Sequence, residues 1–173
     1  YFGVLKGLKT YDQAINDPKL QEFFFNFQRK EVIPALGDKI PFDLEEYMFV
    51  IFDRFKNKNI GDKLERIAMD GTGKFPIFVL PTIDMCFKKN IIPIYSIEAV
   101  ASWYVFMHQI HNQELIFDYY EPRWDWIKNF LTENKIDDFT NSLELWSTVP
   151  QNFSDFREIL KEKITDWRIN DYR

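Results

Sequence analysis

The sequence has 173 residues, 46% of them hydrophobic and 18% aromatic, which is enough apolar material for the core of one domain. Acidic residues outnumber basic ones, 27 to 22, and this disfavours nucleic acid, whose binding depends on Lys and Arg neutralising phosphates. A single cysteine, Cys86, excludes an internal disulfide and indicates a buried thiol in a reducing compartment, so we expect a cytoplasmic protein that neither spans nor binds a membrane.

The first third of the chain predicts helices joined by short turns, because glycine is scarce and no segment alternates polar and apolar residues. Thr10 suits the N-cap of a short first helix. Asp17 and Pro18 suit the N-cap and first position of the next, which we expect over about residues 19–33. Pro34 and Gly37 should end that helix, since proline lacks the backbone N–H and glycine suits a helix end.

An amphipathic helix is expected after Asp43, its N-cap. Its apolar residues recur at helical spacing and should face a core. They are Leu44, Tyr47, Met48, Ile51, Phe52 and Phe55. After a turn over residues 57–61, a further helix is expected over residues 62–70, closed by Gly71 at the C′ position.

The remaining helices are expected over about residues 75–88, 96–111, 123–132, 138–147 and 153–167. Ser96 opens the long apolar helix, and Glu121 with Pro122 opens a Trp-rich one. A shift toward Trp, Asp and Asn marks a soft subdomain boundary near residue 112. We therefore treat residues 1–173 as one all-α domain with that internal boundary.

Several residues that often carry chemistry are better explained as structural. Residues 71–74 lack the earlier glycine and the following Ser or Thr of a phosphate loop, and no G-x-G-x-x-G fingerprint for a dinucleotide occurs. His108 and His111 have no third convergent ligand, so no metal site is expected. Cys86 has no neighbour in the sequence that would activate it.

The same applies to the aromatic and acidic residues of the second half. Glu121 and the pair Asp137-Asp138 resemble helix caps more than a general acid pair. The five tryptophans are spaced as core anchors, although an aromatic platform for a sugar stays open. They are Trp103, Trp124, Trp126, Trp146 and Trp167.

The densest charged cluster lies over residues 66–74. Arg66 and Asp70 are spaced i, i+4 and could pair on a helix, and Lys74 follows a turn that two glycines permit. A guanidinium and an ammonium beside such a turn could hold a polyhydroxyl or carboxylate ligand. An ordinary surface ion pair followed by a glycine cap is the more common explanation of such a pattern.

Motifs over residues 54–82 carry a resemblance to a known family. They are Arg54-Phe55-Lys56-Asn57-Lys58-Asn59-Ile60, then Arg66-Ile67-Ala68-Met69-Asp70-Gly71-Thr72-Gly73-Lys74-Phe75-Pro76, then Val79-Leu80-Pro81-Thr82, with Ala99-Val100-Ala101-Ser102-Trp103 further on. Together they resemble the polyol-specific long-chain dehydrogenases, such as mannitol 2-dehydrogenases and fructuronate reductases. Lys58 departs from the family's usual proline and Val79 from its leucine.

The resemblance implies a two-domain enzyme in which an N-terminal Rossmann domain holds NAD or NADP and an all-α C-terminal domain covers the cleft. It also implies metal-free chemistry, in which a lysine acts as general base while an asparagine and a histidine steady the oxyanion. These three residues form a K-x-x-x-x-N-x-x-H motif, which we expect upstream of Tyr1. Within this chain, the resemblance assigns substrate contacts to Arg66 and Lys74, and no catalytic, cofactor-binding or metal-binding residue.

We therefore expect the substrate-binding half of an NAD(P)-dependent polyol or sugar-acid oxidoreductase, inactive by itself and paired with the nucleotide-binding domain of the same chain. Oxidation of mannitol to fructose is favoured, because residues 69–74 resemble the mannitol and fructuronate branch. A non-enzymatic helical interaction module would account for the amphipathic helices equally well, since periodicity predicts helices and not chemistry. The sequence upstream of Tyr1 would decide between the two.

Overall fold

The computed structural model describes residues 1–37, 40–132 and 135–169, and over these ranges the regular elements are helices, with one isolated antiparallel bridge between Thr10 and Lys63. The all-α class is confirmed. In chain order the elements are α1 (Phe2–Leu5), α2 (Tyr11–Asn16), α3 (Pro18–Phe27), the π-helix η1 (Gln28–Val32), α4 (Ile33–Leu36), α5 (Leu44–Lys56), α6 (Leu64–Ala68), α7 (Gly71–Lys74), the π-helix η2 (Phe75–Val79), α8 (Leu80–Lys88), α9 (Ile94–His111), α10 (Trp124–Ile127), the 3-10 helix η3 (Lys128–Phe130), α11 (Ile136–Asn141), α12 (Leu143–Trp146), α13 (Val149–Asn152) and α14 (Ser154–Ile169).

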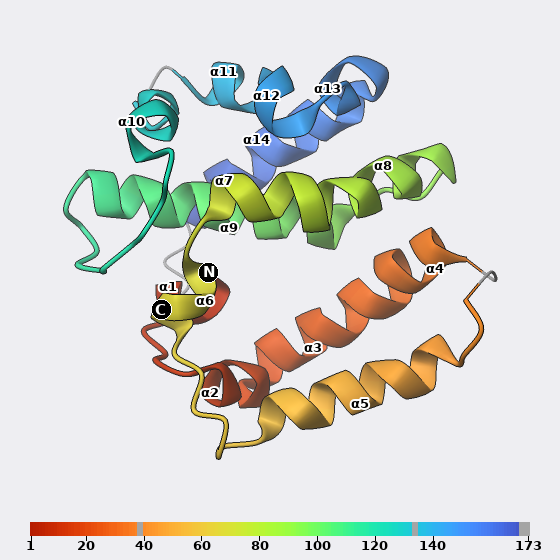
Figure 1. The fold of residues 1–173 in the computed structure, drawn as a ribbon. Coiled ribbons are helices and arrows are strands. Elements are labelled where there is room, and N and C mark those ends of the chain that lie inside the picture. Colours follow the sequence, from red (N-terminus) through yellow and green to blue (C-terminus); the bar gives the residue numbers. More distant parts are fainter. Residues whose placement is uncertain (38–39, 133–134, 170–173) are drawn as a thin grey trace.

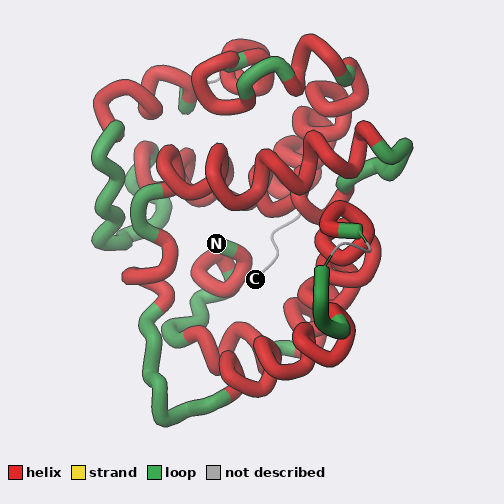
Figure 2. The backbone as a smooth tube through the Cα atoms, turned by 45° about the vertical axis from the view of Figure 1, so that its right-hand side comes forward, coloured by secondary structure: helices red, strands yellow, loops and turns green. Residues whose placement is uncertain are grey.

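The helices lie in two layers (Figure 1). One layer holds α2 to α5, and the other holds α7 to α14, with α1 and α6 between them. In the turned view of Figure 2, the first helix lies inside a ring formed by the other helices. The chain therefore passes from α6, which carries Arg66 between the layers, into α7 of the second layer, which carries Lys74.

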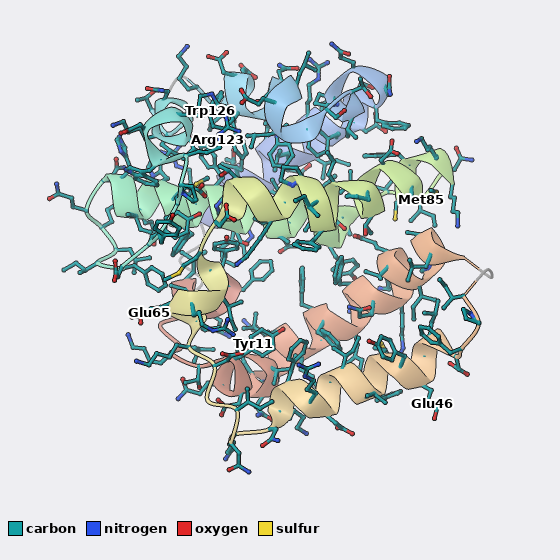
Figure 3. All side chains as sticks on the ribbon, viewed as in Figure 1. Tyr11, Glu46, Glu65, Met85, Arg123 and Trp126 are labelled. Atoms are coloured by element: carbon teal, nitrogen blue, oxygen red, sulfur yellow. The ribbon has the colours of Figure 1, made fainter. Side chains whose placement is uncertain are left out.

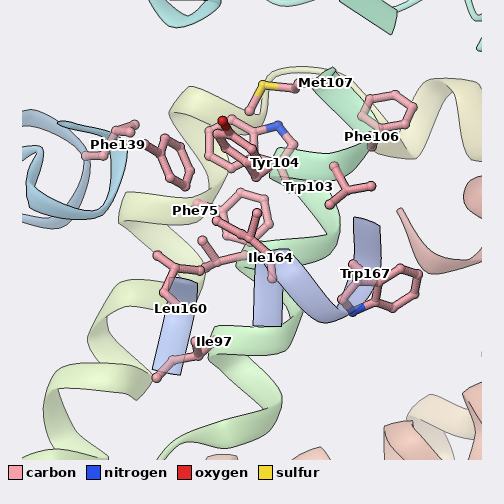
Figure 4. Close-up of a cluster of buried hydrophobic side chains, with 14 of the residues drawn as sticks. Phe75, Ile97, Trp103, Tyr104, Phe106, Met107, Phe139, Leu160, Ile164 and Trp167 are labelled. Carbon is pink, nitrogen blue, oxygen red and sulfur yellow. The ribbon is translucent and has the colours of Figure 1, made fainter. Parts of the chain in front are cut away.

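The core is built around α9. Every residue from Val100 to His108 is buried, so this helix has no solvent face along that stretch. Helix α14 packs along it and contributes Leu160, Ile164 and Trp167 (Figure 4). The core draws on residues from both sides of position 112, and the boundary expected there stays a prediction. In the part of the chain that the structure describes, no helix combines the length and apolarity needed to cross a bilayer.

Local capping signals in the first half are confirmed. Asp17 accepts hydrogen bonds from the backbone N–H groups of Lys19 and Leu20, both at 3.1 Å, and Pro18 is the first residue of α3. Asp43 accepts from the N–H of Glu46 at 2.9 Å and begins α5. These caps rest on contacts within three residues, which is why the sequence reveals them.

The predicted apolar stripe of α5 is only partly buried. Met48 and Phe52 lie in the core, whereas Tyr47 is 49% exposed. Helix α5 packs mainly on α2, and its Phe49 and Phe52 rings contact aromatic rings of α3. It is the outermost element of its layer, so a single row of its side chains is enclosed.

Gly37 ends the helix as expected, with φ of +69°, whereas Pro34 does not. The chain widens into the π-turn η1 over Gln28–Val32 and then continues as α4 to Leu36, with Pro34 at its second position. The same arrangement recurs where η2 precedes Pro81. A π-turn lengthens the hydrogen-bonded ring by one residue, which accommodates a proline that neither donates an N–H nor fits an unbroken α-helix.

The remaining boundaries differ from the expected ones in three places. The long helix begins at Ile94, two residues before Ser96, because its N-terminal N–H groups are satisfied by a distant side chain described below. The Trp-rich helix is shorter and becomes a 3-10 turn at Lys128. The helix expected over residues 138–147 is divided at Ser142, whose hydroxyl caps α12, and an additional short helix, α13, precedes α14.

Candidate substrate-binding site

The turn over residues 69–74 is shaped by Asp70. Helix α6 ends at Ala68, and Asp70 takes a left-handed conformation with φ of +56°. Its carboxylate accepts from the N–H of Gly73 at 3.1 Å, and its carbonyl accepts from the N–H of Lys74 at 3.0 Å. Asp70 is thus the N-cap of α7 and Gly71 is the first residue of that helix, which corrects the expectation that Gly71 closes the preceding one.

The predicted ion pair between Arg66 and Asp70 is wrong. Arg66 pairs with Asp62 instead, at 2.6 Å between Nη2 and Oδ1, and its side chain is 68% exposed. Asp70 is unavailable because α6 ends before it and its carboxylate turns toward Gly73. The guanidinium therefore points back along α6 into solvent.

The Lys74 side chain reaches back from α7 to the end of α6. Its ammonium donates to the carbonyl of Ile67 at 2.9 Å, and its side chain is half-buried. Ile67 follows Arg66 directly in α6, so the structure brings the Lys74 ammonium to the helical turn that carries Arg66. The guanidinium of Arg66, by contrast, is directed toward Asp62.

The two glycines of the turn are required by close packing. A Cβ added at Gly71 would overlap the indole ring of Trp103, and one added at Gly73 would lie 2.7 Å from the carboxylate oxygens of Asp70. Trp103 is fully buried and stacks on Phe75 with ring centroids 4.7 Å apart. The turn is therefore pressed against the core of the molecule, as Figure 4 shows for Phe75 and Trp103.

Three consecutive residues of a distant loop hold this turn in place: Tyr119, Tyr120 and Glu121, which we call the 119–121 bracket. The carbonyl of Tyr120 accepts from the N–H of Asp70 at 2.9 Å, and the hydroxyl of Tyr119 accepts from the N–H of Gly71 at 3.3 Å. Glu121 accepts from the N–H of Thr72 at 3.1 Å. Sequence analysis assigned Glu121 to helix capping, and it missed this contact because the partners lie 49 residues apart.

The phenol groups near the turn stay protonated donors. Burial and the nearby charge of Glu121 raise the pKa of Tyr119 far above its ordinary value of 10.0. Burial, more than any other effect, raises the pKa of Tyr1 as well, and its hydroxyl donates to the carbonyl of Ala68 at 2.8 Å. The end of α6 is thereby fixed by a hydrogen bond from the first residue of the chain.

A buried carboxylate also caps α9 from a distance. Glu31, in the π-turn η1, is 1% exposed and accepts from the N–H of Tyr95 at 2.5 Å and the N–H of Ser96 at 2.8 Å. Its burial raises the pKa of its carboxyl group. Cys86 is fully buried beside it, and burial raises the pKa of that thiol to about 11, so it is a poor nucleophile.

The other candidates of the second half have structural surroundings. His108 is buried and stacks on Tyr104. Within the described ranges, no group of three or more His, Cys, Asp or Glu side chains could hold a metal ion. Trp103, Trp146 and Trp167 are core anchors as predicted.

The remaining two tryptophans, Trp124 and Trp126, are only half-buried. The guanidinium carbon of Arg123 lies 3.8 Å from the centroid of the Trp126 ring (Figure 3). Trp124 lines a polar hollow of about 300 Å³ together with His111, Gln113 and Tyr119. The possibility of an aromatic sugar platform therefore has a place in the structure and stays a prediction.

The fold and this turn define a class: an all-helical domain in which the turn between α6 and α7 follows Arg66, ends at Lys74 and is held by contacts from distant parts of the chain. This chain belongs to the mannitol dehydrogenase C-terminal domain family, whose model matches residues 1–166. The match extends well beyond the motifs of residues 54–82 and includes most of the tail after residue 112.

Individual relatives agree with this assignment. The chain is 30% identical over 159 residues to a D-arabinitol 4-dehydrogenase of Klebsiella pneumoniae, an alignment that covers 88% of this chain and 34% of the relative. It is 34% identical over 124 residues to mannitol dehydrogenase 2 of Saccharomyces cerevisiae, covering 70% of this chain and 24% of that protein. The chain thus spans about a third or less of the length of these relatives.

A solved structure shares the fold throughout. Pseudomonas fluorescens mannitol 2-dehydrogenase, solved as a ternary complex with NAD and D-mannitol, superimposes with a TM-score of 0.90 at 25% identity, covering 99% of this chain and 35% of that one. A D-sorbitol dehydrogenase solved in substrate-free form has the same fold, with a TM-score of 0.79 at 24% identity.

Proposed function

We propose that residues 1–173 form the substrate-binding domain of an NAD(P)-dependent polyol dehydrogenase, with mannitol oxidised to fructose as the leading reaction. The observation that carries this proposal is the match of almost the whole chain to a mannitol 2-dehydrogenase that was solved with NAD and D-mannitol. Family membership over residues 1–166 supports the enzyme over an interaction module. The free thiol of Cys86 fits a reducing compartment, and the cytoplasm is the proposed location.

Arg66 and Lys74 are the proposed substrate contacts. The Arg66–Asp62 pair is exposed, and such pairs are weak, so the guanidinium can exchange this partner for a substrate hydroxyl at little cost. The Lys74 ammonium has three N–H donors and gives one to the Ile67 carbonyl, so it can hold that carbonyl and a substrate hydroxyl together. Both groups would grip hydroxyls away from the carbon that loses hydride.

The residues of this chain do not fit a dinucleotide. No G-x-G-x-x-G sequence occurs, and over the described ranges no strand is present to carry such a turn. NAD or NADP, which would accept the hydride, is therefore assigned to an N-terminal domain of the same protein, together with the general base. This chain supplies substrate contacts and the surface that closes over them.

Kinetics of the full-length enzyme test the proposal, with mannitol, arabinitol and sorbitol each offered with NAD and NADP. Arg66→Ala and Lys74→Ala should each lower kcat/KM for mannitol by roughly 10- to 150-fold, because each removes a charged donor to a hydroxyl. Nucleotide affinity should stay nearly unchanged. Arg66→Lys should restore only part of the loss, since the planar fork of donors is absent.

Arg29→Ala is the matched control. Arg29 also forms an exposed ion pair, with Glu45, on the layer formed by α2 to α5. Its loss removes the same charge and should leave kcat/KM unchanged. Wild-type kinetics in both the Arg66 and the Lys74 alanine variants would reduce the pair to a surface feature. A full-length protein that oxidises no polyol would favour the interaction module instead.

A further inference from the structure

The 119–121 bracket binds the turn that carries Lys74 through its backbone. The N–H groups of Asp70, Gly71 and Thr72 donate in order to Tyr120, Tyr119 and Glu121. The next two N–H groups, of Gly73 and Lys74, donate to Asp70. All five backbone donors from residue 70 to residue 74 are thus occupied, three of them by one loop that is distant in sequence.

Glu121 is the centre of this arrangement. Its side chain lies in a residue that is only 6% exposed. Each of the two carboxylate oxygens accepts two hydrogen bonds. Oε2 accepts from the Thr72 N–H at 3.1 Å and the Tyr119 hydroxyl at 2.9 Å. Oε1 accepts from the Thr72 hydroxyl and from the Arg123 N–H at 3.2 Å. A buried carboxylate with four donors is held in one orientation.

The chemistry of these donors requires a carboxylate and excludes the amide of the same shape. Each oxygen of Glu121 faces a backbone N–H, one from Thr72 and one from Arg123, and a backbone donor cannot reverse its direction. A glutamine would place its NH₂ group against one of these N–H groups in either of its two orientations. The hydroxyl groups of Tyr119 and Thr72 can rotate, but they cannot remove that clash.

Tyr119 links the carboxylate to the core. Its hydroxyl donates to Glu121 and accepts from the Trp103 indole N–H at 3.0 Å and from the Gly71 N–H at 3.3 Å, which uses its one donor and both acceptor positions. Trp103 is fully buried in α9. The bracket therefore links the turn to α9, the helix that is buried on all sides from Val100 to His108.

We infer that Glu121 and Tyr119 are positioning residues for the polyol: they hold α7 so that the Lys74 ammonium stands at the substrate hydroxyls. This inference rests on the proposed function, since it assigns to Lys74 the substrate contact proposed above. Neither residue touches the substrate. Their effect reaches it through the backbone of residues 70–72 and the side chain of Lys74.

A double-mutant cycle on the full-length enzyme tests the inference. Glu121→Gln should lower kcat/KM for mannitol roughly 10- to 100-fold, mainly through the KM for mannitol, because a small displacement of a positioning group is costly. The KM for the nucleotide should stay nearly unchanged. In the Lys74→Ala background the same substitution should have little further effect, because the group that it positions is gone.

Tyr119→Phe is a second and milder variant, which keeps the ring and removes only the hydroxyl, and it should show the same dependence on Lys74. Glu31→Gln is the matched control. Glu31 is an equally buried carboxylate whose two oxygens also face backbone N–H groups, of Tyr95 and Ser96, at the opposite end of α9 from His111. It should lower thermal stability to a similar extent and leave kcat/KM for mannitol unchanged.

The outcomes separate the two proposals. Suppose that Glu121→Gln or Tyr119→Phe lowers kcat/KM for mannitol in the Lys74→Ala background as much as in the wild-type enzyme, or that Glu31→Gln lowers it as much as Glu121→Gln does. Either result would show a general structural effect and overturn the positioning role. If Lys74→Ala itself keeps wild-type kcat/KM, the substrate contact of the proposed function is wrong. If Lys74→Ala lowers kcat/KM and its effect adds fully to that of Glu121→Gln, the positioning inference is overturned while the proposed function stands.

Discussion

Asp70 shows how one side chain decides what its neighbours can do. The i, i+4 spacing of Arg66 and Asp70 predicts a pair only if the helix continues through both residues. The helix ends at Ala68, and Asp70 caps the next one from a left-handed conformation. The sequence contained this signal, because Asp before Gly-x-Gly suits both a cap and a left-handed residue, but Gly71 suits equally well the C′ position of a helix that runs to Asp70.

Gly71→Ala is predicted to destabilise the domain by about 3 kcal/mol, because the new methyl group would overlap the fully buried indole of Trp103 and neither side can move far. Unfolding in urea, followed by circular dichroism, measures the change. Gly61→Ala is the control: Gly61 has a φ of +60° with nothing near its Cβ position, so it should lose only about 1 kcal/mol of backbone preference. Equal losses in the two variants would contradict the packing explanation.

At the scale of single helices, sequence analysis succeeds where a cap is local. Asp17 and Asp43 were predicted and are confirmed, since each accepts from N–H groups two or three residues ahead. It fails where the cap comes from elsewhere. The long helix begins two residues before Ser96 because Glu31 satisfies its first donors from a π-turn more than sixty residues earlier. No periodicity within residues 90–111 contains that information.

The two kinds of cap should differ in their contribution to stability. Glu31→Ala leaves the buried N–H groups of Tyr95 and Ser96 without an acceptor and should lower the free energy of unfolding by about 3 kcal/mol. Asp43→Ala removes an exposed cap that water can replace and should cost about 1 kcal/mol. Chemical denaturation of both variants measures the difference. A loss from Asp43→Ala as large as that from Glu31→Ala would contradict it.

At the scale of the whole molecule, several large apolar side chains remain exposed near the turn over residues 69–74. In η2, which follows Lys74 directly, Ile77 is 65% exposed and Phe78 is 71% exposed. Tyr120, in the bracket itself, is 62% exposed. Under the proposed two-domain architecture, these side chains suit contact with the nucleotide-binding domain, since interfaces within a chain commonly bury roughly 600–1,500 Å².

Residues 1–173, produced alone, should therefore fold as a helical domain that oxidises no polyol, binds a hydrophobic dye and self-associates. Circular dichroism, a mannitol assay, dye fluorescence and analytical ultracentrifugation test these points. Replacing Ile77 and Phe78 by Ser should weaken dye binding and self-association. Val50→Ser is the control, because Val50 is 57% exposed on α5, in the other layer. Measurable turnover by the isolated domain, or equal effects of the two sets of substitutions, would refute this picture.

The partnership of α9 and α14 has a consequence for synthesis of the protein. Helix α9 needs cover on every side, and Leu160, Ile164 and Trp167 of α14 provide part of it from late in the sequence. At about 5–20 residues per second, a ribosome takes several seconds to translate from the end of one helix to the start of the other. Until α14 is made, the face of α9 that Leu160, Ile164 and Trp167 cover has no partner, so this apolar helix cannot complete its packing before translation is nearly finished.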